Sequence, residues 1–453
     1  MATSDPVRTE IDEWLATNWD PDLSVGEWWE RLGLAGWSAP TLPTNAYGHD
    51  LSRGDAVTVH DAIAEHGALP APGGLGLLLA APTIAAHGTD DQVERYVRDI
   101  VTGQRAWCQL FSEPGAGSDL AGLQARAERD GEEWVVNGQK VWTSSGHVAD
   151  LGMLIARTDP DAPKHRGISY FAIDMHQPGI DIRPLREMTG RALFNEVFLT
   201  DATTGADTII GDANNGWAVA NATLAFERSG LGSGGGSSAR SAALPGTVAG
   251  HLERRAGDFV PDDERRASSK RTTPEAAPGE EKKEAEAPSA EQGRFGGMAR
   301  LLAGLARSTG VLGDATVRQD LVRLHTLNEI GRINNLRVKA AKQAGRDLPG
   351  MGNLAKLSMS DVVRLQRDLG LRIAGPAGML HSYDGDGADD IVEATGLRRL
   401  GTVTELALFA QAPPIYGGTD QVQRNIIGER VLGLPKEPND DRSTPFRDLP
   451  KNA

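Results

Sequence analysis

Hydrophobic residues recur every three or four positions along the first hundred residues of the chain. The segments EIDEWLATNW, VGEWWERLGL, GDAVTVHDAIAEHG and TDDQVERYVRDIVTG all follow this period, and proline and glycine punctuate the gaps between them. Such spacing predicts amphipathic helices. We therefore expect a helical N-terminal domain over residues 1–105.

The period changes to alternation of polar and apolar residues after residue 105. The segment LQARAERDGEEWVVNGQKVWT alternates along stretches broken by Asp130-Gly131 and Asn137-Gly138, the dipeptides that most favour a hairpin turn. Shorter segments such as GISYFAIDM and NEVFLTD continue the pattern to about residue 201. We expect a β domain over residues 106–212, folded as a small barrel or sandwich.

Helical spacing returns after GDANNGW, so we expect a helical C-terminal domain over residues 213–440 and a tail over residues 441–453. Within it, residues 261–294 contain no valine, isoleucine, leucine, methionine, cysteine or aromatic residue. Such a segment buries too little apolar surface to offset about 1–2 kcal/mol per residue of backbone ordering. We predict a disordered charged insert over residues 258–294, for which a flexible loop without function is a sufficient explanation.

Composition narrows the class of protein. The 453 residues are 39% hydrophobic and 24% charged and carry a formal net charge of −15, which argues against binding to nucleic acid or to an anionic membrane. The one cysteine, Cys108, excludes an intrachain disulfide and suits a cytoplasmic protein. No apolar run is long enough to cross a membrane, no export signal opens the chain, and the scattered histidines predict no metal site.

Two neighbouring segments contain candidate ligand-binding residues. SEPGAGSD, at 112–119, can point backbone amides at an anion and adds the hydroxyl of Ser118. VNGQKVWTSSG, at 136–146, places Trp142 before three hydroxyl residues, which suits stacking on a planar ring system. Each also has an ordinary structural explanation, as a simple turn and as a core tryptophan.

The third candidate segment is PPIYGGTDQVQRNIIGERVLGLP at 413–435. Gly417 and Gly418 predict a tight turn, and Thr419 or Asp420 predicts the cap of the following helix. Gln423 is placed to close a capping box from Asp420. A purely structural role explains this segment as well.

Taken together, the three segments resemble the signatures of the acyl-CoA dehydrogenase family. LFSEPGAGSDLAGLQARAERDGEEWVVNGQKVWTSSG is similar to its first signature and IYGGTDQVQRNIIGERVLGLP to its second, with the same order and separation, and the resemblance covers nearly the whole chain. It implies an α+β fold: an N-terminal helical domain, a middle β-barrel and a C-terminal four-helix bundle. It also implies a flavoprotein oxidoreductase of lipid β-oxidation, assembled as a homo- or hetero-oligomer, typically a tetramer.

The resemblance implies FAD as cofactor, an acyl-CoA substrate desaturated at C2–C3, and an electron-transfer flavoprotein as electron acceptor. Trp142 would flank the isoalloxazine ring and Ser144 would bond flavin N5. Ser118, Arg228 and Gly417 would contact the substrate. The residues at cofactor-contacting positions are Phe111, Ser112, Gly117, Ser118, Trp142, Ser144, Arg372, Gly375, Thr419 and Gln421.

The chain departs from the family at the position of its commonest catalytic base. Many members carry a glutamate in a Tyr-Glu-Gly-Thr sequence, and here that position is Gly417. The segment LAFERSGLG offers Glu227 instead. Trp217, Ala220, Leu224, Glu227 and Leu231 fall within an arc of roughly 80° on a helix, so Glu227 lies on the apolar face.

A buried acid is costly unless it is paired or functional. The actinobacterial relatives that act on branched or bulky acyl groups take their base from this helix, and Glu227 matches that position. We therefore expect Glu227 to be the base; an ion pair with Arg228 or with another helix is the structural alternative.

A second departure concerns the Arg-x-x-Phe-Gly segment that usually follows this helix and reaches a neighbouring subunit's FAD. Here the charged insert intervenes, and GRFGG at 293–297 is a poor match. The alternative function is therefore a weakly catalytic or non-catalytic subunit that supports a partner chain in a heteromeric acyl-CoA dehydrogenase. A flavin oxidase or monooxygenase on the same scaffold is a further alternative.

Overall fold

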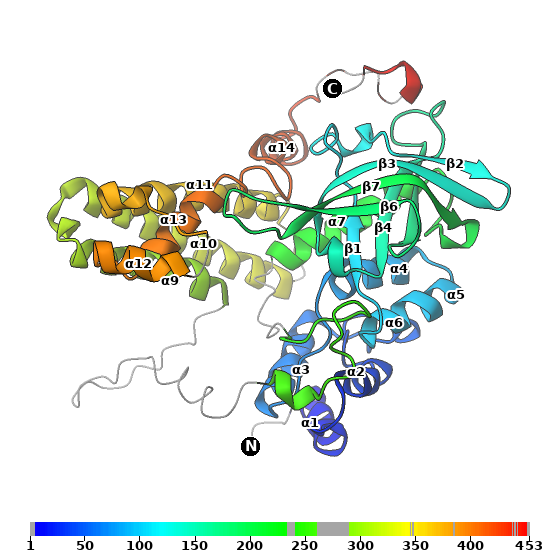
Figure 1. Cartoon of the computed structure of the whole chain (residues 1–453), viewed down its shortest axis with the longest axis horizontal. Helices are drawn as coiled ribbons and strands as arrows, with labels where there is room; N and C mark the ends of the chain where they lie inside the picture. Colours follow the sequence, from blue (N-terminus) through cyan, green and yellow to red (C-terminus); the bar gives the residue numbers. More distant parts are fainter. Residues whose placement is uncertain are drawn as a thin grey trace.

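A computed structural model shows three blocks along the chain: helices, a β-sheet and a helical bundle (Figure 1). The structure describes residues 5–232, 241–260, 290–344, 346, 348–383, 386–436, 438, 441 and 443–450. Most of the segment predicted to be disordered, residues 261–289, lies outside this description. Its two ends differ from the prediction, because residues 256–259 form a 3₁₀ turn and α9 begins at Ala290.

The N-terminal block contains the predicted helices, with the bounds α1 (Pro6–Asn18), α2 (Val25–Leu34), α3 (Arg53–Glu65), α4 (Ala81–His87), α5 (Asp90–Gln92) and α6 (Arg98–Val101). The π-helical turns η2 (Gly76–Ala80) and η3 (Val93–Val97) complete α4 and join α5 to α6. Ser24 and Glu27 form a capping box at the start of α2. The first three helices enclose a core that includes Ile11, Trp28 and Ile63.

The middle block has seven strands: β1 (Trp107–Leu110), β2 (Arg126–Asp130), β3 (Glu133–Ser144), β4 (Leu151–Arg157), β5 (Ile168–Asp174), β6 (Ile180–Leu185) and β7 (Phe194–Gly205). The antiparallel set β2-β3-β7-β6 meets the set β1-β4-β5 where Arg126 pairs with Arg157. Side chains of both sets, such as Val136 and Phe171, form one core.

One of the two predicted hairpin turns is wrong. Asp130-Gly131 joins β2 to β3 as expected, but Asn137-Gly138 lies inside β3 at a shift in register against β7. A Cβ atom on Gly138 would lie 2.5 Å from the Cβ of Ala125, so the glycine permits a close approach of two backbones. The dipeptide therefore marks a bulge, a feature that turn propensity alone does not distinguish from a hairpin.

The C-terminal block begins with α7 (Gly216–Gly232) and continues with α9 (Ala290–Ser308), α10 (Ala315–Gln343), α11 (Met351–Ala374), α12 (Asp386–Thr395), α13 (Leu400–Phe409) and α14 (Asp420–Ile426). Helices α9, α10, α11 and α13 share a core that includes Leu302, Leu324, Leu369 and Val403, as a four-helix bundle requires. No helix in the described part of the chain is long and apolar enough to cross a membrane.

Helix α7 lies outside that bundle core and packs instead where the N-terminal helices meet the sheet. Val219 and Ala220 are buried in the same apolar cluster as Leu79 of η2 and Tyr170 of β5. Helix α11 contacts α7 and also α14, so it connects the two candidate segments of the C-terminal block.

An ordered strap, residues 241–260, runs from the C-terminal side of α7 back to the N-terminal block. Its backbone accepts hydrogen bonds from Val25 (2.8 Å) and Gly26 (2.9 Å). Asp150, only 1% exposed, accepts hydrogen bonds from the amides of Ala106 (2.8 Å) and Thr247 (3.2 Å) and from the Thr247 hydroxyl. The strap is therefore held to the N-terminal helices by its backbone and to the sheet by one buried carboxylate.

We predict that Asp150→Ala lowers the free energy of unfolding by about 2–3 kcal/mol, because it leaves the buried amide of Ala106 and the amide of Thr247 without their acceptor. Urea unfolding measures the change. The control is Asp181→Ala, which removes an exposed carboxylate paired with Arg183 and should cost less than about 0.5 kcal/mol. Equal effects would contradict the proposed anchoring role of Asp150.

Candidate active site

The first candidate segment is a tight turn directly after β1. Glu113 and Ala116 exchange two backbone hydrogen bonds of 3.1 and 3.0 Å across Pro114 and Gly115. Phe111 is buried with its ring edge-on to Tyr170, whereas Gly117 and Ser118 are exposed. The turn thus presents its glycine and hydroxyl at the surface while its base is fixed in the core.

A buried ion pair fixes this turn to β3. The Nζ atom of Lys140 lies 2.8 Å from Oε1 of Glu113 and donates to the Phe111 carbonyl at 3.1 Å. The Glu113 carboxylate also accepts the amides of Gln124 (2.6 Å) and Ala125 (2.9 Å). Burial lowers the pKa of Lys140 and Glu113 opposes that shift. Withdrawing both charges from water is tolerable because hydrogen bonds compensate each of them.

The second candidate segment, at the end of β3, presents an exposed indole. Trp142 is 57% exposed, has a φ of +62°, and occupies a shift in register between Lys140 and Thr143. Its ring lies edge-on to that of Phe194, with 5.8 Å between the ring centres. The structural alternative, in which Trp142 is a core residue, is therefore wrong. Strained bulges of this kind re-aim side chains next to functional sites.

The structure brings the first two segments together. The amide of Val141 donates to the Ser112 carbonyl at 2.9 Å, which sets the glycine turn beside the strand end bearing Trp142 and half-buried Ser144. Sequence reasoning identified both segments but missed Glu113 and Lys140, the residues that join them. No spacing rule relates positions 113 and 140, so the sequence contains no signal for their contact.

The third candidate segment is a turn held by α11. Gly417 and Gly418 have φ values of +61° and +83°, and Thr419 caps α14 by accepting the Val422 amide. The predicted capping box from Asp420 is wrong, because Gln423 donates instead to the carbonyls of Gly417 (3.0 Å) and Gly418 (3.3 Å).

Polar side chains of α11 anchor the same turn. Asn353 donates to Gln423 at 2.7 Å, Lys356 donates to the Pro413 carbonyl at 2.6 Å, and Arg364 forms an ion pair with Asp420. Burial raises the pKa of Asp420, but the hydrogen bonds and the cations of α11 outweigh it and leave the pKa below its ordinary value. Asp420 thus stays charged and holds the turn at neutral pH.

Helix α7 places Glu227 at the edge of the core. Thr223, one turn earlier, is fully buried, and its hydroxyl contacts those of Thr83 (3.0 Å) and Tyr170 (3.3 Å). Glu227 itself is half-buried. The predicted apolar face is thus present around Ala220 and Leu224 and becomes more open toward Glu227.

Of the remaining predicted site residues, some lie near the end of α11 or at the start of α14, and others have side chains that the structure does not describe. Arg372, near the end of α11, forms an ion pair with Asp320 of α10, and Gly375 follows it with a φ of +57°. The side chain of Arg228 and those of 293–296 are outside the described residues. Gln421 is exposed at the start of α14.

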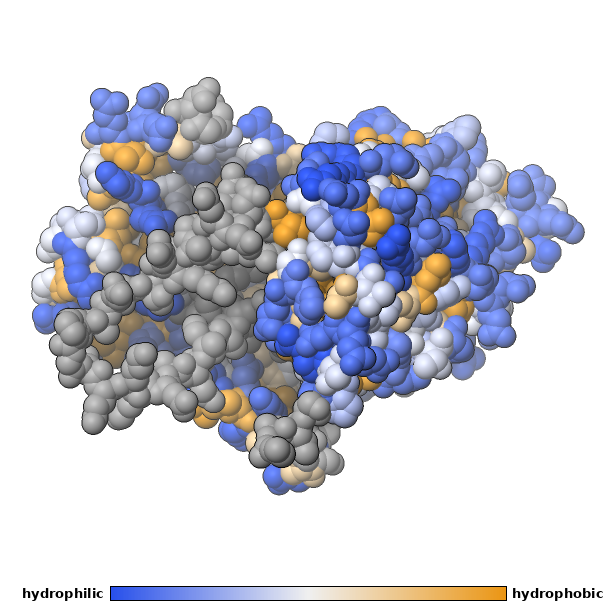
Figure 2. Space-filling model, turned by 90° about the horizontal axis from the view of Figure 1, so that it is seen from below, coloured by the Kyte–Doolittle hydropathy of each residue, from blue (hydrophilic) through white to orange (hydrophobic). Residues whose placement is uncertain are grey.

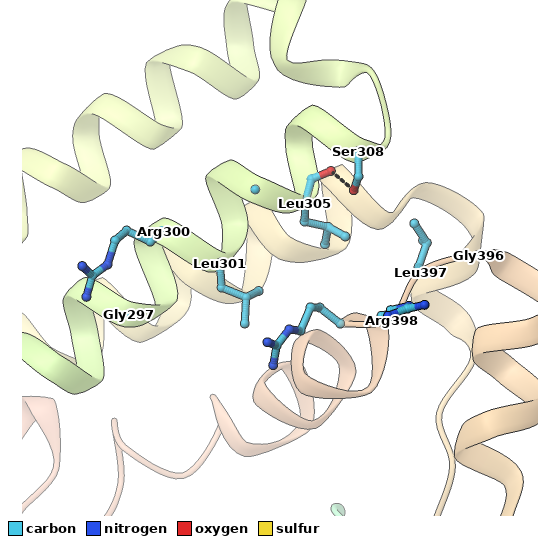
Figure 3. Close-up of a pocket in the computed structure, with 10 residues that line it drawn as sticks. Gly297, Arg300, Leu301, Leu305, Ser308, Gly396, Leu397 and Arg398 are labelled. Carbon is cyan, nitrogen blue, oxygen red and sulfur yellow. Dashed lines mark hydrogen bonds between the residues drawn. The ribbon is translucent and has the colours of Figure 1, made fainter. Parts of the chain in front are cut away.

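A separate groove of about 690 Å³ lies between α9 and the loop before α13 (Figure 3). Leu301 and Leu305 of α9 and Leu397 line it together with Arg300, Arg398 and Arg399. No lining residue belongs to the candidate segments, so this groove is not part of the candidate site.

Comparison with known proteins identifies the family. Models of the acyl-CoA dehydrogenase N-terminal, middle and C-terminal domains match residues 2–104, 108–202 and 293–432. This chain belongs to the acyl-CoA dehydrogenase family and is an oxidoreductase of that class, a family of flavoproteins acting in lipid β-oxidation. The family fold is the one described above.

The similar proteins include mycobacterial enzymes. Acyl-CoA dehydrogenase IpdE1 of Mycobacterium tuberculosis is 33% identical over 90% of this chain and 88% of its own length. IpdE1 of Mycolicibacterium smegmatis is 30% identical over 95% and 97%. The solved ChsE4-ChsE5 complex from Mycobacterium tuberculosis aligns with a TM-score of 0.62 at 26% identity, over 96% of this chain and 100% of that chain.

We predict that Lys140→Met lowers the free energy of unfolding by about 3–5 kcal/mol, because it leaves Glu113 charged and buried. The double substitution Lys140→Met with Glu113→Gln removes both charges and should recover at least half of the loss. Urea unfolding measures both, with the exposed Lys436→Met as control. A double variant less stable than Lys140→Met would show that the charge on Glu113 is not the cause.

Proposed function

We propose that this chain uses FAD to desaturate an acyl-CoA thioester at C2–C3, with Glu227 as the base that removes the C2 proton. The position of Glu227 carries the proposal. It lies one helical turn beyond buried Thr223, on the helix that packs between the N-terminal helices and the sheet, and it is half-buried before any ligand covers it. Further withdrawal from water, as a bound acyl group covers the site, makes a carboxylate a stronger base.

The residues of the first two segments fit a flavin. An indole that is 57% exposed on a strained bulge offers a flat apolar face for a ring system. A Cβ atom on Gly117 would meet no atom within 4 Å, so a ligand has access to the backbone of the turn. We infer that Trp142 and Ser144 border the ring, that Phe111 and Ser112 lie at its edge, and that Gly117 and Ser118 bind near the pyrophosphate and the pantetheine arm.

The third segment completes the proposed cofactor site. Thr419 and Gln421 bind the adenosine side, on a turn that α11 holds rigidly through Asn353, Lys356 and Arg364. We infer that Arg372 and Gly375 approach the cofactor of a neighbouring subunit. When bound, FAD supplies the acceptor for the hydride that leaves C3.

Gly417 replaces the family's commonest base, and its geometry suits a different role. Its φ of +61° favours glycine, and a Cβ atom there would meet no atom within 4 Å. We infer that the Gly417 amide donates to the thioester carbonyl and so acidifies the C2 proton, with Ser118 and Arg228 as further substrate contacts. The open space beside it favours a bulky or branched acyl group.

An oligomer is supported by apolar surface on the bundle. On the face drawn in Figure 2, apolar patches lie on the C-terminal bundle at the left, and others lie among the mainly hydrophilic residues at the right. Val322, Ile330, Ile333 and Leu336 of α10 are each about half exposed. We infer association with a second copy or a related chain, and electron transfer from the flavin to an electron-transfer flavoprotein.

We predict that the Glu227→Gln variant retains FAD. Its flavin should be bleached by an acyl-CoA about 10²–10⁴-fold more slowly than the wild-type flavin under anaerobic conditions, because the substituted amide cannot take the C2 proton. The control, Glu132→Gln in the exposed β2–β3 hairpin, should bleach at the wild-type rate. Wild-type bleaching by a Glu227→Gln variant would refute the role of Glu227. A wild type that retains FAD but bleaches with no thioester would instead indicate a supporting subunit.

We also predict that bulky thioesters bleach the flavin faster than small ones. The panel runs from butyryl-CoA through branched acyl-CoAs to steroid-side-chain thioesters, and stopped-flow absorbance gives the rate for each. The open position at Gly417 is the physical reason. Fast bleaching confined to short straight chains would contradict this specificity and leave the role of Glu227 unaffected.

A further inference from the structure

The C-terminal tail lies against the loop between β4 and β5, residues 158–167, at the top of Figure 1 (red). The Phe446 amide donates to the Ala162 carbonyl at 3.0 Å, and the Arg447 amide donates to the Pro160 carbonyl at 3.0 Å. Pro445 pairs with Pro163 as an isolated bridge, and Arg447 forms an ion pair with Asp161. The tail is therefore bound by its backbone as well as by its side chains.

Phe446 covers a buried cation. The Arg157 guanidinium carbon lies 3.7 Å from the centre of the Phe446 ring, and the two residues are 3% and 6% exposed. Arg157 donates to the carbonyls of Ala121 (2.6 Å) and Lys164 (2.7 Å). Burial lowers the pKa of Arg157 to about 10, and the negative charges of Glu113, Asp159 and Asp119 oppose that shift. The aromatic ring and the two carbonyls add to this stabilisation of the buried charge.

Lys164 provides a second connection from the tail. Its ammonium lies 2.6 Å from Asp119 and 3.3 Å from Asp441. Asp119 directly follows Ser118 in the chain, and Ala121 follows two residues later. Both connections from the tail, through Arg157 and through Lys164, therefore end on residues 119–121.

These residues form the downstream end of the glycine turn 112–118. The upstream end is fixed by Glu113 and Lys140 in the core, as described above. The exposed Gly117 and Ser118 lie between two anchored ends, one held by a buried ion pair and the other by the tail. The same β4–β5 loop contacts α7, because His165 meets Trp217 edge-on at 5.1 Å.

We propose that residues 441 and 443–450 form a latch that fixes the downstream end of this glycine turn and thereby slows the release of bound flavin. Phe446 and Asp441 are its positioning residues, acting through Arg157 and Lys164. The effect on the turn rests on the contacts above, and the effect on flavin release rests on the proposed function. The latch is a property of the folded tail and takes no part in the chemical step.

The test compares the purified full-length chain with a chain ending at residue 440 and with Phe446→Ala. We expect amide hydrogen exchange over residues 112–123 to rise about tenfold in both, and FAD release, followed by flavin fluorescence, to accelerate about tenfold. Three controls should behave as wild type: a chain ending at Pro450, which keeps the latch, Phe446→Tyr, which keeps the ring, and the exposed Glu132→Gln. Asp441→Asn should give a smaller effect in the same direction.

Unchanged exchange over residues 112–123 in the chain ending at residue 440 would overturn the latch. Faster exchange with unchanged FAD release would overturn its effect on the flavin and leave only structural support. A wild type that binds no FAD would refute the proposed function, and the exchange measurement would still decide whether the tail fixes the turn. Far-ultraviolet circular dichroism of each variant confirms that the rest of the chain is folded.

Discussion

The buried ion pair between Glu113 and Lys140 is the constraint on which the candidate site depends. Both charges are withdrawn from water, so the structure must supply every hydrogen bond that water would have given. It does so with the amides of Gln124 and Ala125 and the carbonyl of Phe111. These contacts bind the turn after β1 to the middle of β3, and the strained strand end bearing Trp142 follows directly.

A shared apolar core then positions helix α7 relative to the sheet that contains this ion pair. Leu79 of η2, Tyr170 of β5 and Ala220 of α7 lie in one cluster, so the helix carrying Glu227 is packed against the sheet rather than within the four-helix bundle. Helix α11 contacts α7 and also holds the Gly417 turn through Asp420. Helix α7, which bears Glu227, and the Gly417 turn are therefore positioned by a common element, although nearly 200 residues of sequence separate Glu227 from Gly417.

Local patterns predicted the fold well because period and turn propensity are local quantities. They located the three blocks and the Asp130-Gly131 hairpin. They failed where tertiary contact decides: Asn137-Gly138 became a bulge because Ala125 packs against it, and Gln423 turned to the Gly417 carbonyl rather than to the cap. The pair formed by Glu113 and Lys140 and the tail contact at Arg157 had no sequence signal, since each joins positions far apart in the chain.

The most direct test of the account is a crystal structure of the chain with FAD and an unreactive acyl-CoA thioether analogue. The quantity to measure is the distance from the Glu227 carboxylate to C2 of the bound acyl group. We predict an oxygen of Glu227 within about 3–4 Å of C2, on the face of the acyl chain opposite the flavin. A different carboxylate at that position, or a Glu227 directed away from the acyl chain, would contradict the account.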